Sequence, residues 1–319
     1  MSVPTRTGFT VICTPSERKN HDSRLARNAA PTFGSKDVCT LEPCPRPVGM
    51  TETLSIPSLT LRVRSLDRSG EFYVRKLGFF IVHHGHERLE LGVEPGGAPL
   101  LTIIPGAERA APREAAGLFH AALLLPSREA LASWLSFAAA QGIEFEGFSD
   151  HGVSEAIYLS DPDGIGLEIY TDRPRSEWPT AHGELAMTTR PLAIRPLLER
   201  ARPTSAPLAG GRWGHLHLRV TDLARSEAYY RTTLGLDVTQ SSYLGARFLA
   251  AGGYHHHLGI NTWGRPTLPS PSDAAGLADA VFARVSATVE EMHTDPDGIA
   301  LRVTPLSPSP REALPVNAQ

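Results

Sequence analysis

The sequence has little cysteine, and all of it lies near one end. Its three cysteines, Cys13, Cys39 and Cys44, fall within the first fifty residues. An odd number of cysteines cannot form a complete disulfide framework, and these spacings match no zinc motif. We therefore expect a reducing, cytoplasmic location and no thiolate metal site in the remaining chain.

Long apolar runs and an excess of one charge are also missing. No apolar run reaches the roughly 18–20 residues that a membrane-spanning helix needs. The net charge is only −3, from 31 Lys and Arg against 34 Asp and Glu. Such a balance provides no basic field for a polyanion. We therefore expect neither a membrane nor a nucleic acid as a partner.

The two ends of the chain lack the periodicity of folded elements. Residues 1–50 contain clusters of Pro, Ser, Arg and Asn, without the apolar region of a signal peptide. They are predicted to be a disordered extension, or to precede a translation start at Met50. The Pro-rich residues 306–319 are predicted to form a disordered tail.

The rest of the 319 residues is dominated by an internal repeat. LRVRSLDRSGEFYVRKLGF at residues 61–79 recurs as LRVTDLARSEAYYRTTLGL at residues 218–236. Each copy begins with strand-like alternation and continues with helical spacing up to a glycine. A second pair, DPDGIGLEIY at 161–170 and DPDGIALRVT at 295–304, is a turn followed by an alternating strand. Together these repeats predict a β-α-β-β-β module written four times.

The modules predict an α+β protein with two domains of curved mixed sheets. The modules are expected near residues 57–105, 117–173, 213–266 and 276–305. The domains are expected at residues 51–178 and 211–305, joined by a linker at 179–210.

The fourth module is shorter than the others. The interval from Gly276 to Asp295 is about 25 residues shorter than the equivalent interval from Gly117 to Asp161. We expect this module to lack its first strand and early helix, which leaves its sheet incomplete. The exposed edge could be covered by a second copy of the chain in a homodimer.

Histidine and carboxylate are the strong metal ligands that the folded part can offer. His120 and His215 open strands at matching places in two modules, and Glu168 lies in the apolar strand sequence GLEIY. A lone carboxylate would be costly to bury there, so it either faces outward or pairs with a cation or metal. Two imidazoles and one carboxylate form the facial triad of non-haem Fe(II) sites, and they also suit Mn(II), Ni(II) or Zn(II).

These repeats resemble the vicinal oxygen chelate superfamily, which includes glyoxalase I, bleomycin-resistance proteins and type I extradiol dioxygenases. Residues 117–126, 150–178 and 251–263 resemble most the bacterial two-domain CatE-like catechol-2,3-dioxygenase proteins. The resemblance implies a metal-dependent oxidoreductase of aromatic compound catabolism. The enzyme would use Fe(II) and O2 for the extradiol cleavage of a small catecholic aromatic, or of another substrate with two adjacent oxygens.

The resemblance also implies roles for four residues. His120 and Glu168 match two of the metal ligands of the extradiol enzymes. Tyr158 matches a tyrosine ten residues before the ligand glutamate, and His151 lies close to the place of a catalytic histidine. Such a pair can hydrogen-bond to a bound catecholate or move its protons.

The remaining ligand departs from the pattern. Module one should supply a histidine near residue 58, but Ser58 stands there, whereas module three has His215 at the matching place. Arg302 replaces the glutamate in module four.

Three further histidines follow in module three. His255, His256 and His257 are expected in its last strand, where alternation places the first and third on one face. His257 is a candidate fourth ligand, or a side chain that supports the ligands.

Two arrangements of the modules stay open. If modules two and three share a site, it holds His120, Glu168 and His215, with His257 beside them. If each half folds on itself, neither half holds three ligands. Counting ligands favours the first arrangement, although the order of pairing is not encoded in the repeats.

Two other functions use the same scaffold. A glyoxalase-type lyase or isomerase would use a metal as a Lewis acid without O2. A bleomycin-resistance-like protein would bind a small molecule without turnover, and the short fourth module with Arg302 is in keeping with such a degenerate relative.

Overall fold

The computed structural model describes residues 53–306. The extension 1–50 with its three cysteines, and residues 307–319 of the tail, lie outside the described residues. Within the described part, no helix is both long enough and apolar enough to cross a membrane.

Four modules follow one another along the chain, each opening with a strand. Module one comprises β1 (Leu54–Arg62), α1 (Leu66–Gly70), η1 (Glu71–Leu77), β2 (Phe80–His84), β3 (Leu89–Gly92) and β4 (Leu101–Ile104). Module two comprises β5 (Gly117–Leu124), α2 (Arg128–Ala140), β6 (Gly147–Asp150), β7 (Ser154–Ser160) and β8 (Gly166–Asp172). Module three comprises β12 (Arg212–Arg219), α4 (Leu223–Leu234), β13 (Asp237–Gln240), β14 (Ala246–Ala250) and β15 (Leu258–Asn261). Module four comprises β16 (Gly276–Arg284), β17 (Glu291–Thr294) and β18 (Ala300–Pro305).

A connecting segment lies between modules two and three. Its short elements are η2 (Arg175–Glu177), β9 (Thr180–Ala181), β10 (Glu184–Leu185), β11 (Arg190–Pro191) and α3 (Ile194–Leu198).

The two repeated helical segments end at the glycines that the sequence predicts, and each begins at a capped first turn. Ser65 and Asp222 cap their first turns, each accepting a hydrogen bond from the backbone N–H three residues on. The segment of α1 and η1 ends at Gly78 with φ of 95°, and α4 ends at Gly235 with φ of 67°. Glycine adopts this left-handed conformation without the penalty of a Cβ atom.

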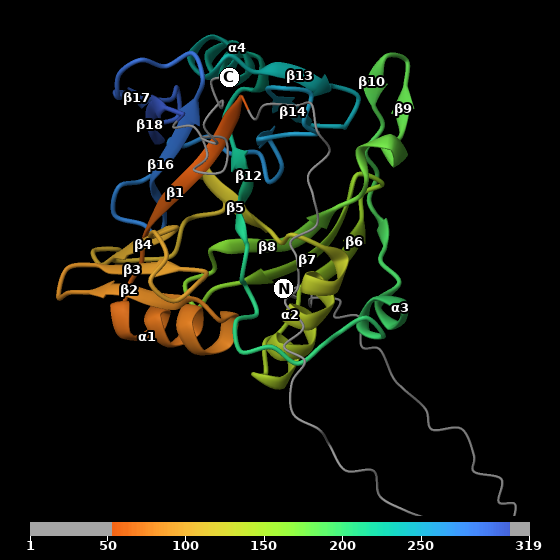
Figure 1. Cartoon of the computed structure of the whole chain (residues 1–319). Coiled ribbons are helices and arrows are strands. Elements are labelled where there is room, and N and C mark those ends of the chain that lie inside the picture. The colour runs from red at the N-terminus through yellow and green to blue at the C-terminus, as the bar shows by residue number, and fades with distance from the viewer. Residues whose placement is uncertain (1–52, 307–319) are drawn as a thin grey trace, which may run out of the picture. The chain divides into compact units, whose positions relative to one another are not determined.

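The sheets pair module two with module three and module one with module four. The opening strands β5 and β12 run antiparallel to each other, as do β1 and β16. In every module the last strand lies parallel to the first: β8 on β5, β15 on β12, β4 on β1 and β18 on β16. Figure 1 shows β5 and β12 side by side, between the other strands of their two modules. Of the two expected arrangements, the structure therefore has the one in which modules two and three share a sheet.

Module four differs from the sequence-based expectation. Its first strand, β16, is present and pairs with β1 along most of its length. The missing part is the helix and one strand that follow the first strand in module two. The expectation of a missing first strand was wrong because the deletion falls after Arg284 and leaves the strand that begins at Gly276 intact.

The DPDG motifs connect modules that are consecutive in the sequence: module two with module one, and module four with module three. In the first half, Asp163 accepts a hydrogen bond from the Arg64 backbone N–H at 2.8 Å and pairs with the guanidinium of Arg68. The buried Tyr73 hydroxyl donates to Asp161 at 3.2 Å. The loop before β8 is thereby held against the first helix of module one.

The second half repeats this clamp. Asp297 accepts from the Thr221 backbone N–H at 3.0 Å and from Arg225 at 2.9 Å, while the Tyr230 hydroxyl donates to Asp295 at 2.8 Å. The residues shared by the two sequence repeats are therefore the ones that bind each other.

The helix of module two also secures module one. Trp134 of α2 is fully buried, and its indole N–H donates to the Leu77 carbonyl at 3.1 Å. Burial of so large a side chain with its polar atom satisfied is strongly stabilising. The helix therefore holds β5 and β8 in place from one side and leaves their other face free to line a pocket.

Candidate metal centre and pocket

Three adjacent strands bring the predicted ligands together. In the pairing of β5 with its neighbours, Ala122 lies opposite Glu168 of β8 on one side and His215 of β12 on the other. Residues in register across a sheet point to the same face, and His120 shares the face of Ala122 because it is two residues away. The order β8–β5–β12 thus places His120, Glu168 and His215 on one face.

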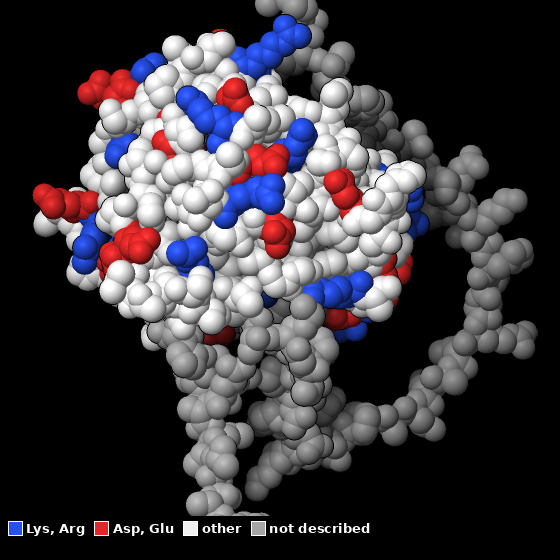
Figure 2. Space-filling model, turned by 90° about the horizontal axis from the view of Figure 1, so that it is seen from above, with Lys and Arg blue, Asp and Glu red and all other residues white. Residues whose placement is uncertain are grey.

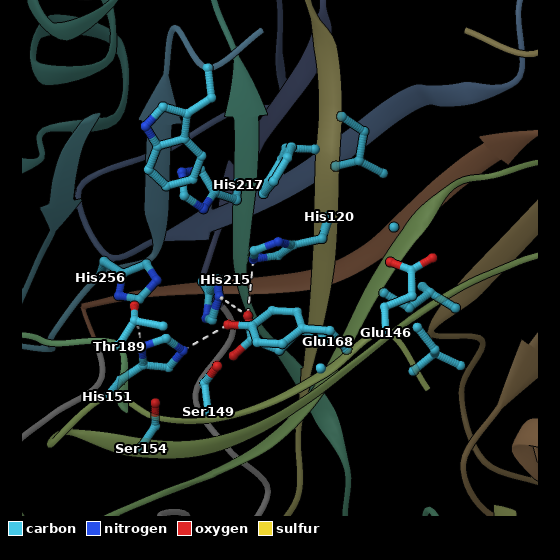
Figure 3. A pocket seen from close by; sticks show the side chains of 18 of the residues that line it. His120, Glu146, Ser149, His151, Ser154, Glu168, Thr189, His215, His217 and His256 are labelled. Carbon is cyan, nitrogen blue, oxygen red and sulfur yellow. Dashed lines mark hydrogen bonds and ion pairs between the residues drawn. The ribbon is translucent and has the colours of Figure 1, made fainter. Parts of the chain in front are cut away.

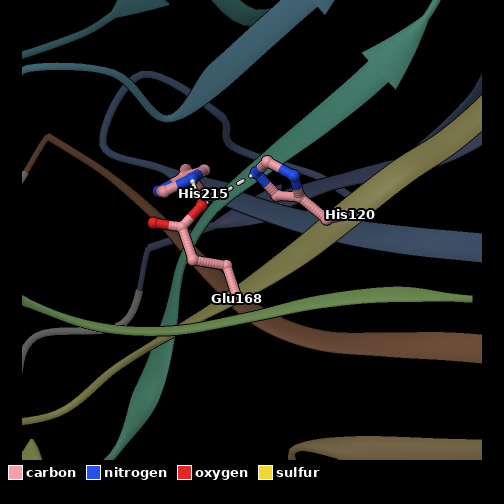
Figure 4. Close-up of side chains that lie close together, drawn as sticks. All are labelled: His120, Glu168 and His215. Atoms are coloured by element: carbon pink, nitrogen blue, oxygen red, sulfur yellow. Dashed lines mark hydrogen bonds and ion pairs between the residues drawn. The ribbon is translucent and has the colours of Figure 1, made fainter. Parts of the chain in front are cut away.

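The three side chains converge on one point (Figure 4). One carboxylate oxygen of Glu168 lies 3.0 Å from Nε2 of His120 and 3.2 Å from Nε2 of His215. One ligand atom from each residue lies within 4.8 Å of the others, and all three residues are buried. Two of them come from module two and one from module three.

Charge in this cluster is set by burial and by the neighbours. Burial would raise the pKa of Glu168, but its interaction with His215, and then that with His120, outweighs burial and holds that pKa well below its usual range. Burial lowers the pKa of His215 to about 4, against the opposing pull of Glu168. Near neutral pH the cluster offers a carboxylate and a neutral imidazole, which are the forms that bind a metal.

The donor set fits a divalent cation. Nε2 of His120 and Nδ1 of His215 are buried and have no hydrogen-bond partner among the described residues. Buried polar atoms are rarely left unpaired, so such atoms need a physical reason. A cation held by two imidazoles and a carboxylate would supply the partner for His120, and it would leave other coordination positions open to the pocket.

His151 and Tyr158 also reach this pocket. His151 Nδ1 lies 2.6 Å from the Thr188 carbonyl, which can only accept, so this nitrogen carries the proton. His151 Nε2 therefore accepts a hydrogen bond from the Tyr158 hydroxyl at 2.8 Å. Burial, and then the charge of Glu168, raise the pKa of Tyr158 well above its usual value. The pair thus has a fixed direction of hydrogen bonding beside the cluster.

The structure places His257 differently from the expectation. Residues 254–257 precede β15 and are not part of a strand, so the expected alternation of His255 and His257 was wrong. Nδ1 of His257 accepts from the Ala251 backbone N–H at 3.3 Å, and His257 is not in the ligand cluster. The geometry gives it a role in holding the turn before β15.

Two other histidines enter the pocket and were not singled out as site residues. His217 follows His215 by two residues on β12, and its ring centre is 5.0 Å from that of His120. His256 stacks on His215 with ring centres 4.1 Å apart. Figure 3 shows both turned towards the space around His120 and Glu168. Alternation from His215 was the signal that could have identified His217.

His256 is held from behind by a hydrogen-bonded chain. Its Nδ1 lies 2.7 Å from Nδ1 of His255, and Nε2 of His255 lies 2.9 Å from a carboxylate oxygen of Asp172. The carboxylate can only accept when ionised, so it fixes the proton of His255 on Nε2. In the neutral state, His256 then donates from Nδ1 and presents an unprotonated Nε2.

The pocket has a volume of about 620 Å³, and a group of aromatic side chains forms one part of its wall. Phe119 is the extra residue of a bulge, because His217 pairs with His120 and Leu218 with Leu118. A bulge changes the direction in which a side chain points. Phe119 lines the pocket, and its ring centre is 5.5 Å from that of Trp263. Tyr243 and Phe248 line the pocket beside these rings.

The corresponding positions in the other sheet hold no such ligand set. Ser58 of β1 takes the place of His215, and Asp279 of β16 takes the place of His120. Arg302 of β18 takes the place of Glu168, and its Nε donates to Asp279 at 2.7 Å. The guanidinium thus neutralises the carboxylate here, so modules one and four keep the scaffold without the candidate centre.

The surface carries both charges. On the face seen in Figure 2, the described Lys and Arg side chains are interspersed with Asp and Glu.

Comparison with known proteins gives consistent results. The family described as the Glyoxalase/Bleomycin resistance protein/Dioxygenase superfamily matches residues 55–169 and 212–303. A catechol-2,3-dioxygenase of Bacillus subtilis (strain 168) is 44% identical over 227 residues, which cover 68% of this chain and 78% of the relative.

Solved structures are similar to this chain at low sequence identity. A candidate dioxygenase from Bacillus subtilis subsp. subtilis str. 168 superposes with a TM-score of 0.53 at 14% identity, over 81% of this chain and 86% of that one. Glyoxalase I from Zea mays gives a TM-score of 0.48 at 15% identity, over 79% and 92% of the two chains. The repeated modules, the sheet pairing and the family match agree, and the chain belongs to the Glyoxalase/Bleomycin resistance protein/Dioxygenase superfamily.

Proposed function

We propose that this chain is a non-haem Fe(II)-dependent extradiol dioxygenase that opens the ring of a small catecholic aromatic next to its diol. The observation that carries this proposal is the buried cluster of His120, Glu168 and His215 at an aromatic-walled pocket. The 44% identity to a protein named catechol-2,3-dioxygenase supports the same activity. The reducing, cytoplasmic location expected from cysteine usage would keep iron in the ferrous state.

The three ligands would hold the metal on one side only. Fe(II) held there would supply open coordination positions for a catechol diol and for O2, and a path for electrons between them. His120 and His215 contribute neutral nitrogen donors, and Glu168 contributes one negative charge. The strand pairing that fixes these side chains is formed before any substrate binds, so little reorganisation is needed.

His151 and Tyr158 are placed to handle the protons of the diol. Tyr158 donates its hydroxyl proton to His151, and the Thr188 carbonyl holds the other proton of His151 on Nδ1. His151 Nε2 is therefore the acceptor to which a proton can pass through the Tyr158 hydroxyl. His256, whose ring lies against that of His215, presents a second unprotonated nitrogen. A positioned acid or base of this kind contributes about 100-fold or more to a rate.

The aromatic wall would hold the ring of the substrate. Phe119, Trp263 and Phe248 surround His217 with ring centres 5.3–5.8 Å from it. Edge and stacking contacts with a flat ring suit a catechol, and they exclude water from the reacting atoms.

Anaerobic reconstitution tests this function. The purified chain is loaded with Fe(II) without oxygen, given catechol and then exposed to air, while absorbance and dissolved oxygen are followed. We expect a yellow ring-opened product and the uptake of one O2 per catechol. Glu146→Gln is a matched control, because Glu146 lines the same pocket but is exposed and outside the ligand cluster.

Two results would contradict the proposal. Bound iron without colour or oxygen uptake, across a panel of catechols, would remove the dioxygenase. Turnover with Ni(II) or Zn(II) that consumes no oxygen would instead assign the pocket to a glyoxalase-type lyase or isomerase.

A further inference from the structure

One cation lines the pocket without a neutralising partner. Arg219 is the sole Arg or Lys in the lining formed by the described residues. Its Nε is buried and has no hydrogen-bond partner within residues 53–306, where it also takes part in no ion pair. By contrast, Arg128 and Arg173 near the same sheet both pair with Glu155.

The burial of Arg219 carries an electrostatic cost. Loss of water around the guanidinium lowers its pKa, and no neighbouring carboxylate acts to raise it again. A charge that is partly removed from water is normally paired in the folded protein. A missing counter-charge at a pocket wall indicates that the pocket's ligand supplies it.

The strand places Arg219 at the end of the pocket away from the ligand cluster. His215, His217 and Arg219 alternate along β12 and so share one face of the strand. At about 3.3 Å per residue, the Cα atoms of the first and last are roughly 13 Å apart. The candidate ligand His215, then His217 and then Arg219 therefore follow one another along the pocket.

The residue that faces Arg219 on the neighbouring strand has no side chain. This partner in the pairing of β12 with β5 is Gly117, and the nearest atoms beside it belong to the small side chain of Ser270. Gly164 and Gly166 line the pocket. The aromatic wall of Phe119 and Trp263 lies nearer to His217. A flat ring held by that wall would direct a substituent towards the guanidinium.

We propose that the substrate is a catechol that carries a carboxylate, and that Arg219 binds this carboxylate while the diol is held at the His120–Glu168–His215 cluster. This inference rests on the dioxygenase function proposed above and names the substrate class of the same site. The planar guanidinium has two parallel N–H donors that match the two oxygens of a carboxylate. Arg219 is accordingly a specificity-determining residue, and it takes no part in the chemistry of the ring.

Acid and ester pairs test the role of the charge. The probes are 3,4-dihydroxybenzoate and 3-(3,4-dihydroxyphenyl)propionate, each compared with its methyl ester, which keeps the diol and removes the charge. For the Fe(II)-loaded wild-type chain, we expect kcat/KM for at least one acid to exceed that of its ester by roughly tenfold to a hundredfold. Arg219→Met keeps the length of the side chain and should bring this ratio to within about twofold of one. Arg113→Met, which alters an exposed arginine outside the pocket, should leave the ratio unchanged.

A binding measurement separates this inference from the proposed function. The metal-free chain is titrated with 3,4-dihydroxybenzoate and with its methyl ester, and the quenching of tryptophan fluorescence gives the two Kd values. We expect tighter binding of the acid to the wild-type chain, and loss of this preference in Arg219→Met. A wild-type chain that prefers neither acid, or an Arg219→Met variant that keeps the preference, would overturn the carboxylate assignment. If the loaded chain cleaves no catechol at all, the proposed function fails, and the metal-free titration still decides the role of Arg219.

Discussion

Replacing Glu168 by Gln should remove the stabilisation that a divalent metal gives to this chain. The change keeps the size of a side chain that is only 2% exposed, and it removes the negative charge that faces two imidazoles. The Glu168 carboxylate oxygen lies 3.0 and 3.2 Å from the two Nε2 atoms, so it is the sole anionic ligand of the cluster. A neutral amide is a much weaker ligand for a hard divalent cation than a carboxylate.

The size of the effect follows from mass action. A metal that binds only the folded state adds about 2.7 kcal/mol to the unfolding free energy at a concentration 100 times its Kd. For a domain of this size, 1 kcal/mol shifts Tm by about 2–4 °C. The wild-type chain should therefore gain roughly 5–11 °C in Tm at that concentration. Glu168→Gln should gain less than about 2 °C.

Thermal unfolding with Mn(II) measures this increment. Mn(II) avoids oxidation during the scan, and each variant is compared with and without the metal, so any change in the stability of the metal-free chain cancels. Glu146→Gln should retain the wild-type increment because Glu146 is exposed in the same pocket and touches no ligand. An increment in Glu168→Gln equal to that of the wild type would refute the assignment of Glu168 as a ligand.

Three further predictions concern the residues around the centre. Tyr158→Phe should lower kcat for catechol by about 100-fold, because it removes the hydroxyl that donates to His151, while metal content stays at the wild-type level. A kcat within twofold of wild type would exclude a role of Tyr158 in proton transfer. Burial lowers the pKa of His257 to about 3, so the folded chain binds fewer protons than the unfolded chain between about pH 3 and 6.5, and stability falls with acidification. Between pH 7 and pH 5, the unfolding free energy of His257→Gln, measured with urea, should therefore fall by roughly 2 kcal/mol less than that of the wild type. An equal fall in the two proteins would contradict this role of His257. Asp163→Ala should lower the unfolding free energy by about 2 kcal/mol, because it leaves the Arg64 N–H without its acceptor and breaks an ion pair with the partly exposed Arg68. In urea titrations, the control variant Asp67→Ala, at an exposed position, should lose much less unfolding free energy than Asp163→Ala.

Local patterns in the sequence predicted the elements and the three residues that form the central cluster. The end of a helix depends on neighbouring residues, and so Gly78 ends a helical segment in the structure as in the sequence. His120, Glu168 and His215 were expected together because only modules two and three jointly hold three ligands. The structure joins these modules through β5 and β12.

Other features depend on contacts that no local pattern contains. The choice between the two module pairings is made by long-range strand association, and the repeats are equally compatible with both. The turn before β15 begins at Gly252 and Gly253, whose φ values of 61° and 66° end the strand geometry. His257 therefore leaves the alternation expected of it, and His256 enters the pocket. The bulge at Phe119 likewise arises from the register of two strands distant in sequence.

The location of a bound metal is the most direct test of this account. Anomalous diffraction at the Mn edge, from crystals of the Mn(II)-loaded chain, would show the ion and the atoms around it. The account predicts one site, with Nε2 of His120, Nε2 of His215 and an oxygen of Glu168 each within about 2.3 Å of the ion. An ion bound elsewhere, for example between His255 and Asp172, or no ion at the cluster at saturating Mn(II), would contradict it.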